Sequence, residues 1–311
     1  MRIISFATED SAWKSPRMGI ILNVDGRDSG DRLDCEKLFE PADRPSNPLA
    51  WFDTSEKWFQ TSRDTAIRLG SDAAARAEAR SKGWLVPSEA AYWFAPVPRP
   101  GKIVCVGLNY RDHAEESGLA VPATPVIFSK FSSCVIAPGE PVVIPRTSEK
   151  VDFEAELAVV IGKHAKNVRG DRAYDYVLGY TVFNDVTARD FQFGDGQWQR
   201  GKSCDTFAPM GATIVTTDEI PDPHTLRIKL TINGTTMQDS NTSQLIFSIP
   251  QIIEFITQST SLEPGDVIAT GTPAGVGFAR KPPVFLQAGD VMDIDIEKIG
   301  GLGNPVVAAE H

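Results

Sequence analysis

Short apolar runs alternate with turn-forming residues through the last two thirds of the chain, and this alternation constrains the fold most. Their aliphatic and β-branched composition is typical of strands. The runs cover residues 102–106, 125–128, 141–144, 155–161, 179–183, 212–215, 226–232, 267–270 and 291–296. The 25 glycines and 22 prolines supply many turns and disfavour a helical bundle. We therefore expect a strand-rich α+β fold with few helices.

Two local signals predict particular elements in this part of the chain. Asn233 and Gly234, directly after the run at 226–232, are the residues that a type I′ hairpin turn favours. Ser248 and Gln251 can form a capping box, and the apolar residues that follow give a helix one buried face. We expect a hairpin at the first position and a helix at the second.

The first third of the chain has a different pattern. Residues 3–6 and 19–24 are typical of strands, whereas residues 62–82 are Ala-rich and charged and indicate a helix. A cluster of prolines then marks an extended connector, after which a new strand begins. We predict an N-terminal accessory region at 1–97 and a catalytic domain at 98–311.

Composition narrows the possible partners. The net charge is −10 and no run of Lys or Arg occurs, so the chain lacks the basic surface that neutralises phosphates. No apolar run is long enough for a membrane span. The four cysteines are widely spaced without a C-x-x-C pair, and the first residues lack a signal-peptide pattern. We expect a cytoplasmic protein with reduced thiols, binding neither nucleic acid nor membrane.

The segment VDFEAELAVVIG at 151–162 places two acids in an apolar strand. Glu154 and Glu156 point to one face, about 6.6 Å apart along the strand, and Ala158 and Val160 continue that face. If the face is buried, the two carboxylates need a cation. The alternative is a strand edge where both acids meet water, and this segment alone does not decide between them.

A third acid favours the first interpretation. Asp185, in FNDVTARDFQ, lies at the end of the run at 179–183. Three carboxylates without a neighbouring Cys or His ligand form an all-oxygen site, which suits Mg²⁺, Mn²⁺ or Ca²⁺ rather than Zn²⁺. Mg²⁺ keeps several water ligands, and these leave positions open for a chelating substrate.

The segment GLNYRDHAEESG at 107–118 contains a possible general base. In a helical turn His113 and Glu116 share one face, and the carboxylate would fix the tautomer of the imidazole. Such a pair can activate a water molecule. The alternative is an exposed helix with an incidental histidine, which an isolated H-x-x-E pattern favours. The flanking glycines make a mobile lid plausible.

The segment GQWQRGKS at 196–203 matches the P-loop expression but not its structural requirements. A P-loop needs a strand before it and a helix after it, whose amides hold the phosphates. The residues before it make a poor buried strand, and Pro209 and Gly211 prevent a full helix after it. We therefore reject nucleotide binding and keep Lys202 as a single cation near an anionic substrate.

The segment LEPGDVIATGTPAGVG at 262–277 is a strand that leads into a glycine-rich turn. The Thr272 hydroxyl and the closely approaching backbone can bind a carboxylate or carbonyl oxygen. Alone, the pattern favours the simpler alternative, a tight turn that needs glycine.

Together these segments resemble the fumarylacetoacetate hydrolase family, most closely its acylpyruvase-like and FAH-domain-containing-2-like members. The resemblance covers about residues 102–306 and depends on the order of six motifs. These are GLNYRDHAEESG, FSK at 128–130, VDFEAELAVVIG, FNDVTARDFQ, GQWQRGKSCDTFAPMG and GDVIATGTPAGVG. It implies a β-roll of mixed sheets, a small β-containing N-terminal domain and a homodimer.

The resemblance also implies roles for particular residues. Matching positions assign metal ligation to Glu154, Glu156 and Asp185, water activation on a lid to His113 and Glu116, substrate contact near the metal to Lys202, and further substrate contacts to Arg189, Gln192 and Thr272. Founding members use one more aspartate upstream of the lid histidine. Residues 101–110 contain no acid, so we expect three protein carboxylates and water molecules around Mg²⁺ or Mn²⁺.

The implied activity is divalent-metal-dependent hydrolysis of a carbon–carbon bond in a 2-oxo acid or 1,3-diketo acid. The metal would stabilise an enolate, and water activated by His113 and Glu116 would attack a carbonyl. Decarboxylase, isomerase or lyase chemistry on the same enolate is the alternative, because one fold can host all of these reactions. A non-catalytic metabolite-binding relative is disfavoured because the acids, His113 and Lys202 are all present.

Overall fold

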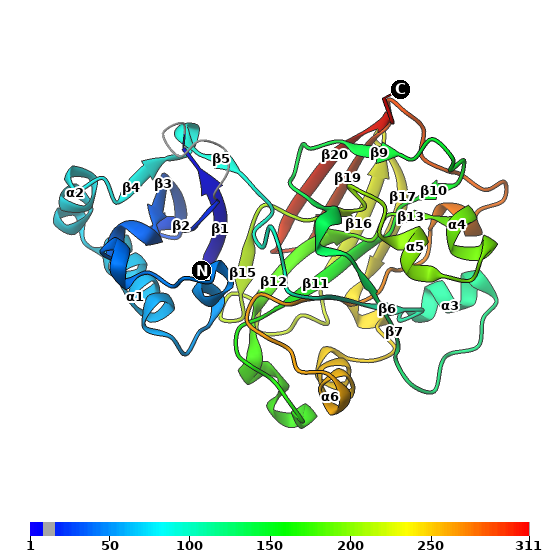
Figure 1. Ribbon diagram of the computed structural model, residues 1–311, viewed down its shortest axis with the longest axis horizontal. Helices are drawn as coiled ribbons and strands as arrows, with labels where there is room; N and C mark the ends of the chain where they lie inside the picture. Colours follow the sequence, from blue (N-terminus) through cyan, green and yellow to red (C-terminus); the bar gives the residue numbers. More distant parts are fainter. Residues whose placement is uncertain (9–15, 311) are drawn as a thin grey trace.

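The molecule has a small N-terminal lobe and a larger second lobe (Figure 1). The computed structural model describes residues 1–8 and 16–310. The small lobe consists of β1 (Arg2–Ala7), β2 (Arg17–Val24), β3 (Arg27–Asp34), α1 (Lys57–Ser71), α2 (Ala73–Ser81), β4 (Leu85–Pro87) and β5 (Tyr92–Trp93). Where one Ala-rich helix is predicted, two occur, because Asp72 ends α1 and its side chain caps α2 by accepting a hydrogen bond from Ala75.

The larger lobe contains most of the strands and four helices within the described residues. Its first half consists of β6 (Ile103–Gly107), α3 (Arg111–Ser117), β7 (Val126–Lys130), β8 (Val135–Ile136), β9 (Val142–Ile144), β10 (Val151–Asp152), β11 (Ala155–Ile161), β12 (Val177–Asn184), β13 (Thr187–Ala188), α4 (Arg189–Gly194) and α5 (Trp198–Lys202). Its second half consists of β14 (Ala208–Pro209), β15 (Ile214–Thr216), β16 (Arg227–Ile232), β17 (Thr235–Asn241), α6 (Ile249–Ser259), β18 (Val267–Ala269), β19 (Val291–Ile296) and β20 (Gly300–Ala308). Helices α3, α4 and α5 lie together on the side far from the small lobe (Figure 1).

Two main sheets organise these strands. Within the described residues, one sheet follows the order β4-β3-β2-β1-β15-β12-β11-β18-β6-β7, with β5 paired to β1. The second follows β17-β16-β19-β20-β9. Both sheets are mixed, because β18 pairs with β6 and β20 pairs with β9 in parallel while their other neighbours are antiparallel. The predicted strand-rich α+β fold is confirmed.

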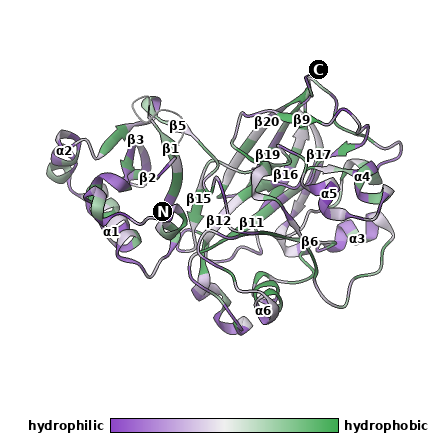
Figure 2. Cartoon of the chain, viewed as in Figure 1, coloured by the Kyte–Doolittle hydropathy of each residue, from purple (hydrophilic) through white to green (hydrophobic). Residues whose placement is uncertain are grey.

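Strand β11 lies at the centre of the packing and is buried on both faces. Leu157 and Val159 belong to the apolar cluster that includes Ile228 of β16, in the second sheet. Ala158 and Val160 belong to a different cluster, shared with α1 of the small lobe. Figure 2 shows that the central strands are apolar and that α1, α2, α3 and α5 are more polar. The predicted burial of both faces is confirmed, and with it the buried setting of the acids nearby.

The small lobe is joined to the large one through backbone pairing. Ile3 of β1 pairs with Ile214 of β15, so the long sheet runs through both lobes. Thr54 also donates a backbone hydrogen bond to the Gly162 carbonyl at 2.8 Å, at the end of β11. Because the lobes share a sheet and an apolar cluster, the division at residue 98 stays a prediction.

The local signals for turns and caps agree with the structure. Asn233 and Gly234 have φ values of 51° and 77° and close the β16–β17 hairpin. The Ser248 backbone N–H donates to Gln251 Oε1 at 2.8 Å at the start of α6. The four cysteines are free. No helix in the part of the chain that the structure describes is long and apolar enough to cross a bilayer.

Candidate active site and metal centre

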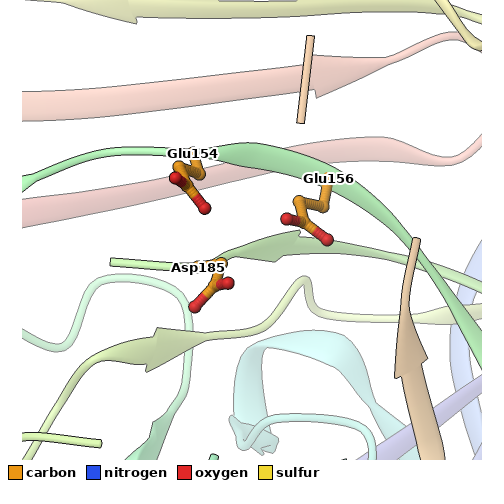
Figure 3. A group of neighbouring side chains, drawn as sticks. All are labelled: Glu154, Glu156 and Asp185. Atoms are coloured by element: carbon orange, nitrogen blue, oxygen red, sulfur yellow. The ribbon is translucent and has the colours of Figure 1, made fainter. Parts of the chain in front are cut away.

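Three acids lie together where β11 begins and β12 ends. Glu154 immediately precedes β11, Glu156 is its second residue, and Asp185 follows β12. The two strands are antiparallel, and the Asp185 N–H donates to the Glu154 carbonyl at 2.9 Å, which brings the third acid opposite the other two. One carboxylate oxygen of each acid lies within 4.8 Å of the others (Figure 3).

These acids are buried, so the solvated strand edge is excluded. Glu154, Glu156 and Asp185 are 6%, 2% and 0% exposed. Lys202 Nζ lies between two of them, 2.6 Å from Glu154 Oε2 and 2.7 Å from Asp185 Oδ2. Burial by itself would raise the pKa of Glu154, but the charges of Lys202 and Arg189 outweigh it and lower the pKa to about 2.

Glu156 is the member of the triad that lacks a cation. Its Oε2 accepts a hydrogen bond from the Gly271 N–H at 2.7 Å, and no basic side chain of the described residues pairs with it. Burial raises its pKa well above the usual range, and the neighbouring charges of Asp185 and Glu154 raise it further. An oxygen-only cluster that holds unbalanced negative charge fits a divalent cation such as Mg²⁺ or Mn²⁺.

The predicted His–Glu pair is formed, with a buried histidine and a more exposed glutamate. His113 on α3 is 7% exposed, and its Nδ1 lies 3.3 Å from Glu116 Oε2. Glu116 also accepts a hydrogen bond from the Gly275 N–H at 2.9 Å. Although burial raises the pKa of Glu116, the hydrogen bonds from His113 and Gly275 lower it overall. An exposed helix with an incidental histidine is therefore the wrong interpretation.

Arg189 and Gln192 on α4 lie beside the triad. Arg189 Nη2 donates to Glu154 Oε1 at 2.5 Å, Nε donates to Asp152 at 2.8 Å, and Nη1 donates to Gln192 Oε1 at 2.9 Å. The guanidinium thus orients a carboxylate of the triad. Contact between substrate and these two side chains stays a prediction.

Thr272 lies between the strands, with its hydroxyl engaged by protein groups. Oγ1 donates to the Ala155 carbonyl at 3.0 Å and accepts from Gln238 Nε2 at 2.8 Å. The hydroxyl therefore fixes the loop after β18 to β11. Its contact with substrate also stays a prediction.

A pocket of about 120 Å³ connects these groups. Its polar lining consists of Glu154, Glu156, His113, Ser117, Lys202, Arg189, Gln192 and Thr272, and its aromatic lining consists of Phe128, Phe193, Trp198 and Phe278. Asp185 and Glu116 contact members of this lining. The fold therefore gathers every residue that the sequence singled out, from five separate segments, around one cavity.

The match to the P-loop expression at residues 196–203 has no P-loop structure behind it. Helix α4, not a strand, precedes the match, and Lys202 is the last residue of the five-residue helix α5. The Lys202 ammonium is held by two carboxylates, which would repel a phosphate.

Sequence reasoning missed three residues of this site. Asp152 accepts from Arg189, Lys130 Nζ lies 2.6 Å from Asp185 Oδ1, and the Phe278 ring lies 4.3 Å from the Arg189 guanidinium. Asp152 could have been found from the sequence, because it lies two residues before Glu154 and so shares the face of Glu154 and Glu156 in an extended strand. Lys130 is the last residue of the FSK motif, whereas nothing in the sequence pointed to Phe278.

The family model for the fumarylacetoacetate (FAA) hydrolase C-terminal domain matches residues 102–307, which include all of these site residues. The chain belongs to the fumarylacetoacetate hydrolase family. It is 42% identical to the mitochondrial oxaloacetate tautomerase of Xenopus laevis over 309 residues, covering 99% of this chain and 90% of that protein. It is thus an enzyme of this family.

Solved structures with the same fold come from enzymes of different names. The 5-carboxymethyl-2-hydroxymuconate delta-isomerase of Mycobacterium smegmatis matches with a TM-score of 0.72 and 33% identity over 100% of both chains. The fumarylacetoacetate hydrolase of Exiguobacterium antarcticum matches with a TM-score of 0.77 and 32% identity, over 99% of this chain and 100% of that one. The fold alone therefore does not select one reaction.

Proposed function

We propose that this chain is a divalent-metal-dependent keto–enol tautomerase of a small 2-oxo acid of the oxaloacetate type. The observation that carries the proposal is the buried carboxylate triad, with unbalanced charge at Glu156, across one small pocket from the His113–Glu116 pair. Similarity to a named oxaloacetate tautomerase over nearly the whole chain supports this choice among the family's reactions.

The chain's own residues would move and hold the proton. With Nδ1–H of His113 donating to Glu116, Nε2 would take the hydroxyl proton of the enol and deliver it to carbon 3, and in the reverse direction it would carry a proton from carbon 3 to the 2-oxo oxygen. Phe278 and the other aromatic side chains give the pocket an apolar wall beside the reacting acid. Lys202 and Arg189 hold Glu154 in its ionised form beside the reacting acid.

Glu154, Glu156 and Asp185 would hold the cation. When bound, a divalent cation supplies Lewis-acid stabilisation of the negative charge that develops on the 2-oxo oxygen.

The test follows two reactions of oxaloacetate separately, tautomerisation and decarboxylation. The enzyme is given the enol form, and the loss of its ultraviolet absorbance is recorded while pyruvate release is assayed in parallel. We expect accelerated loss of the enol without pyruvate, abolished by EDTA and restored by Mg²⁺ or Mn²⁺. Pyruvate formed as fast as the enol disappears would instead identify a decarboxylase.

Hydrolysis of an acylpyruvate is the second candidate, because the His113–Glu116 pair is also suited to activating water. It requires a water molecule between the imidazole and the substrate carbonyl. Cleavage of acylpyruvate by the same preparation, faster than tautomerisation of oxaloacetate, would establish it. Isomerase and lyase reactions are tested with 2,4-diketo acids in the same assay.

Assembly and location complete the proposal. We propose a homodimer that acts in the cytoplasm, whereas the name of the Xenopus relative assigns that protein to mitochondria. Analytical ultracentrifugation tests the dimer, and imaging of the tagged full chain in its own cell tests the location.

A further inference from the structure

The loop that follows β18, residues 270–278, contacts two functional carboxylates through its backbone. The Gly271 N–H donates to Glu156 Oε2 at 2.7 Å, at the metal triad. The Gly275 N–H donates to Glu116 Oε1 at 2.9 Å, on α3, the helix that we propose as a lid. The loop therefore bridges the carboxylate cluster and the helix that carries the proposed base.

Asp152 holds the other end of this loop. It is 0% exposed, and its Oδ1 accepts from the Gly277 N–H at 2.7 Å while its Oδ2 accepts from the Phe278 N–H at 3.2 Å. Oδ2 also accepts from Arg189 Nε at 2.8 Å, and Arg189 in turn donates to Glu154. One buried carboxylate thus ties the loop to the side chain that orients a triad acid.

The Phe278 ring packs near both Arg189 and the proposed base, His113. The Arg189 guanidinium lies 4.3 Å from the ring centroid, and the His113 ring meets Phe278 edge-on at a centroid distance of 6.4 Å. Cation–π and edge-to-face contacts both favour defined orientations. The phenyl ring therefore packs against both the Arg189 guanidinium and the His113 imidazole.

Close packing leaves this loop little freedom. A Cβ on Gly275, whose φ is +104°, would lie 2.1 Å from the Met237 carbonyl oxygen. A Cβ on Gly277 would lie 2.5 Å from Asp152 Oδ1. Glycine is required at both positions because backbone and carboxylate approach so closely.

We infer that Asp152 is a positioning residue for the reaction: it fixes residues 275–278, and this loop fixes the lid helix through Glu116 and His113. For the reaction itself the inference rests on the proposed function. For the lid it rests on the contacts alone.

The first test is Asp152→Asn. Both oxygens of Asp152 accept hydrogen bonds, so an amide NH₂ faces a donor whichever way it turns. We expect kcat to fall about tenfold or more with KM changed less than about threefold, because the base is displaced while the pocket persists. Hydrogen–deuterium exchange in residues 111–119, which Asp152 does not touch, should become about tenfold faster.

The matched control is Asp266→Asn, at the other end of β18. Asp266 is also 0% exposed and accepts backbone hydrogen bonds from Lys102 and Glu263, each at 2.7 Å. Asp266→Asn should lower the free energy of unfolding without changing kcat or the rate of hydrogen–deuterium exchange in residues 111–119. Wild-type lid exchange in Asp152→Asn, or equally fast lid exchange in Asp266→Asn, would overturn the inference.

A second variant decides the question if Asp152→Asn does not fold. Phe278→Leu removes the ring at a partly exposed position, and Phe285→Leu makes the same change outside the site. Faster lid exchange and lower kcat are expected only in the first, and equal exchange in both variants would refute the coupling. Should the wild type not tautomerise oxaloacetate, the exchange results still test the lid, so the two proposals fail separately.

Discussion

Two of the cavities that the described residues form differ greatly in size, and the smaller of the two contains the proposed active site. A cleft of about 880 Å³ lies between the lobes, lined by α1 and by residues beside β12 and β15. Its acid Glu219 is 33% exposed and pairs with the chain's amino terminus at 2.5 Å. The pocket of about 120 Å³ instead contains Glu156, which is 2% exposed and has no cation partner among the described residues.

The comparison shows that unbalanced buried charge identifies this site better than volume. Charges at a wet cleft are solvated and contribute little. Carboxylates without water or a counter-charge are costly, and a fold keeps them where a ligand uses them. Equivalent substitutions in the two cavities should therefore have very different effects.

The largest contrast is expected between Glu156→Gln and Glu219→Gln. Both changes remove one negative charge at nearly constant volume. Glu156→Gln should abolish Mn²⁺ binding by calorimetry and lower turnover about 10³-fold or more, because several kcal/mol of charge stabilisation is lost. Metal-free Glu156→Gln should be at least as stable as the metal-free wild type, because a costly buried charge disappears.

Glu219→Gln loses only the ion pairs with the amino terminus and Arg2 at the cleft, and it should keep Mn²⁺ affinity and turnover. Undiminished Mn²⁺ affinity in Glu156→Gln would remove the triad from metal binding. Equal losses in both variants would show that the two cavities are not independent.

The second-largest effect on turnover is expected when His113 is replaced. His113→Gln should lower turnover by about 10²–10⁴-fold, the usual contribution of a general base, while Mn²⁺ still binds. His164 is the control, because it also pairs with a glutamate, Glu263, at 2.9 Å but is exposed. His164→Gln should retain the wild-type turnover rate. Near-normal turnover in His113→Gln would contradict the assignment of His113 as the general base.

The smaller site could be predicted from the sequence because six motifs, each weak alone, occur in an order that resembles a known family. Alternation along the strand placed Glu154 and Glu156 on one face, and helical spacing paired His113 with Glu116. Spacing does not report what lies opposite a strand, so the pairing of Lys202 with two acids and the position of Phe278 required the tertiary structure. Each depends on contacts between distant segments.

The same reasoning explains which strands were missed. Strand β17 (Thr235–Asn241) is polar and has a single buried residue, and β20 (Gly300–Ala308) contains three glycines and a proline, so neither has an apolar alternation. Pairing with β16 and β19 extends them as strands, and tertiary context thus overrides weak local preference. The cleft between the lobes likewise had no signal, because it arises from the junction of β1 with β15.

A smaller effect is expected at Lys202. Lys202→Met removes the ammonium that lies against Glu154 and Asp185, so turnover should fall about tenfold, a loss of about 1.4 kcal/mol in transition-state stabilisation. Mn²⁺ should still bind, since the triad retains all three carboxylates. ATP should bind to neither protein; micromolar ATP affinity that disappears in Lys202→Met would restore the P-loop interpretation.

The smallest effect is expected for Lys163→Met, the same substitution in the cleft. Lys163 lies two residues beyond the end of β11, the strand that carries Glu156, and no described residue forms an ion pair or hydrogen bond with it. Removing its charge should change stability by no more than about 0.5 kcal/mol, as is usual for surface positions. Turnover should stay within about twofold of wild type, because the carboxylates at the opposite end of β11 keep their partners. A tenfold loss, measured beside Lys202→Met in the same assay, would mean that β11 couples the cleft to the triad.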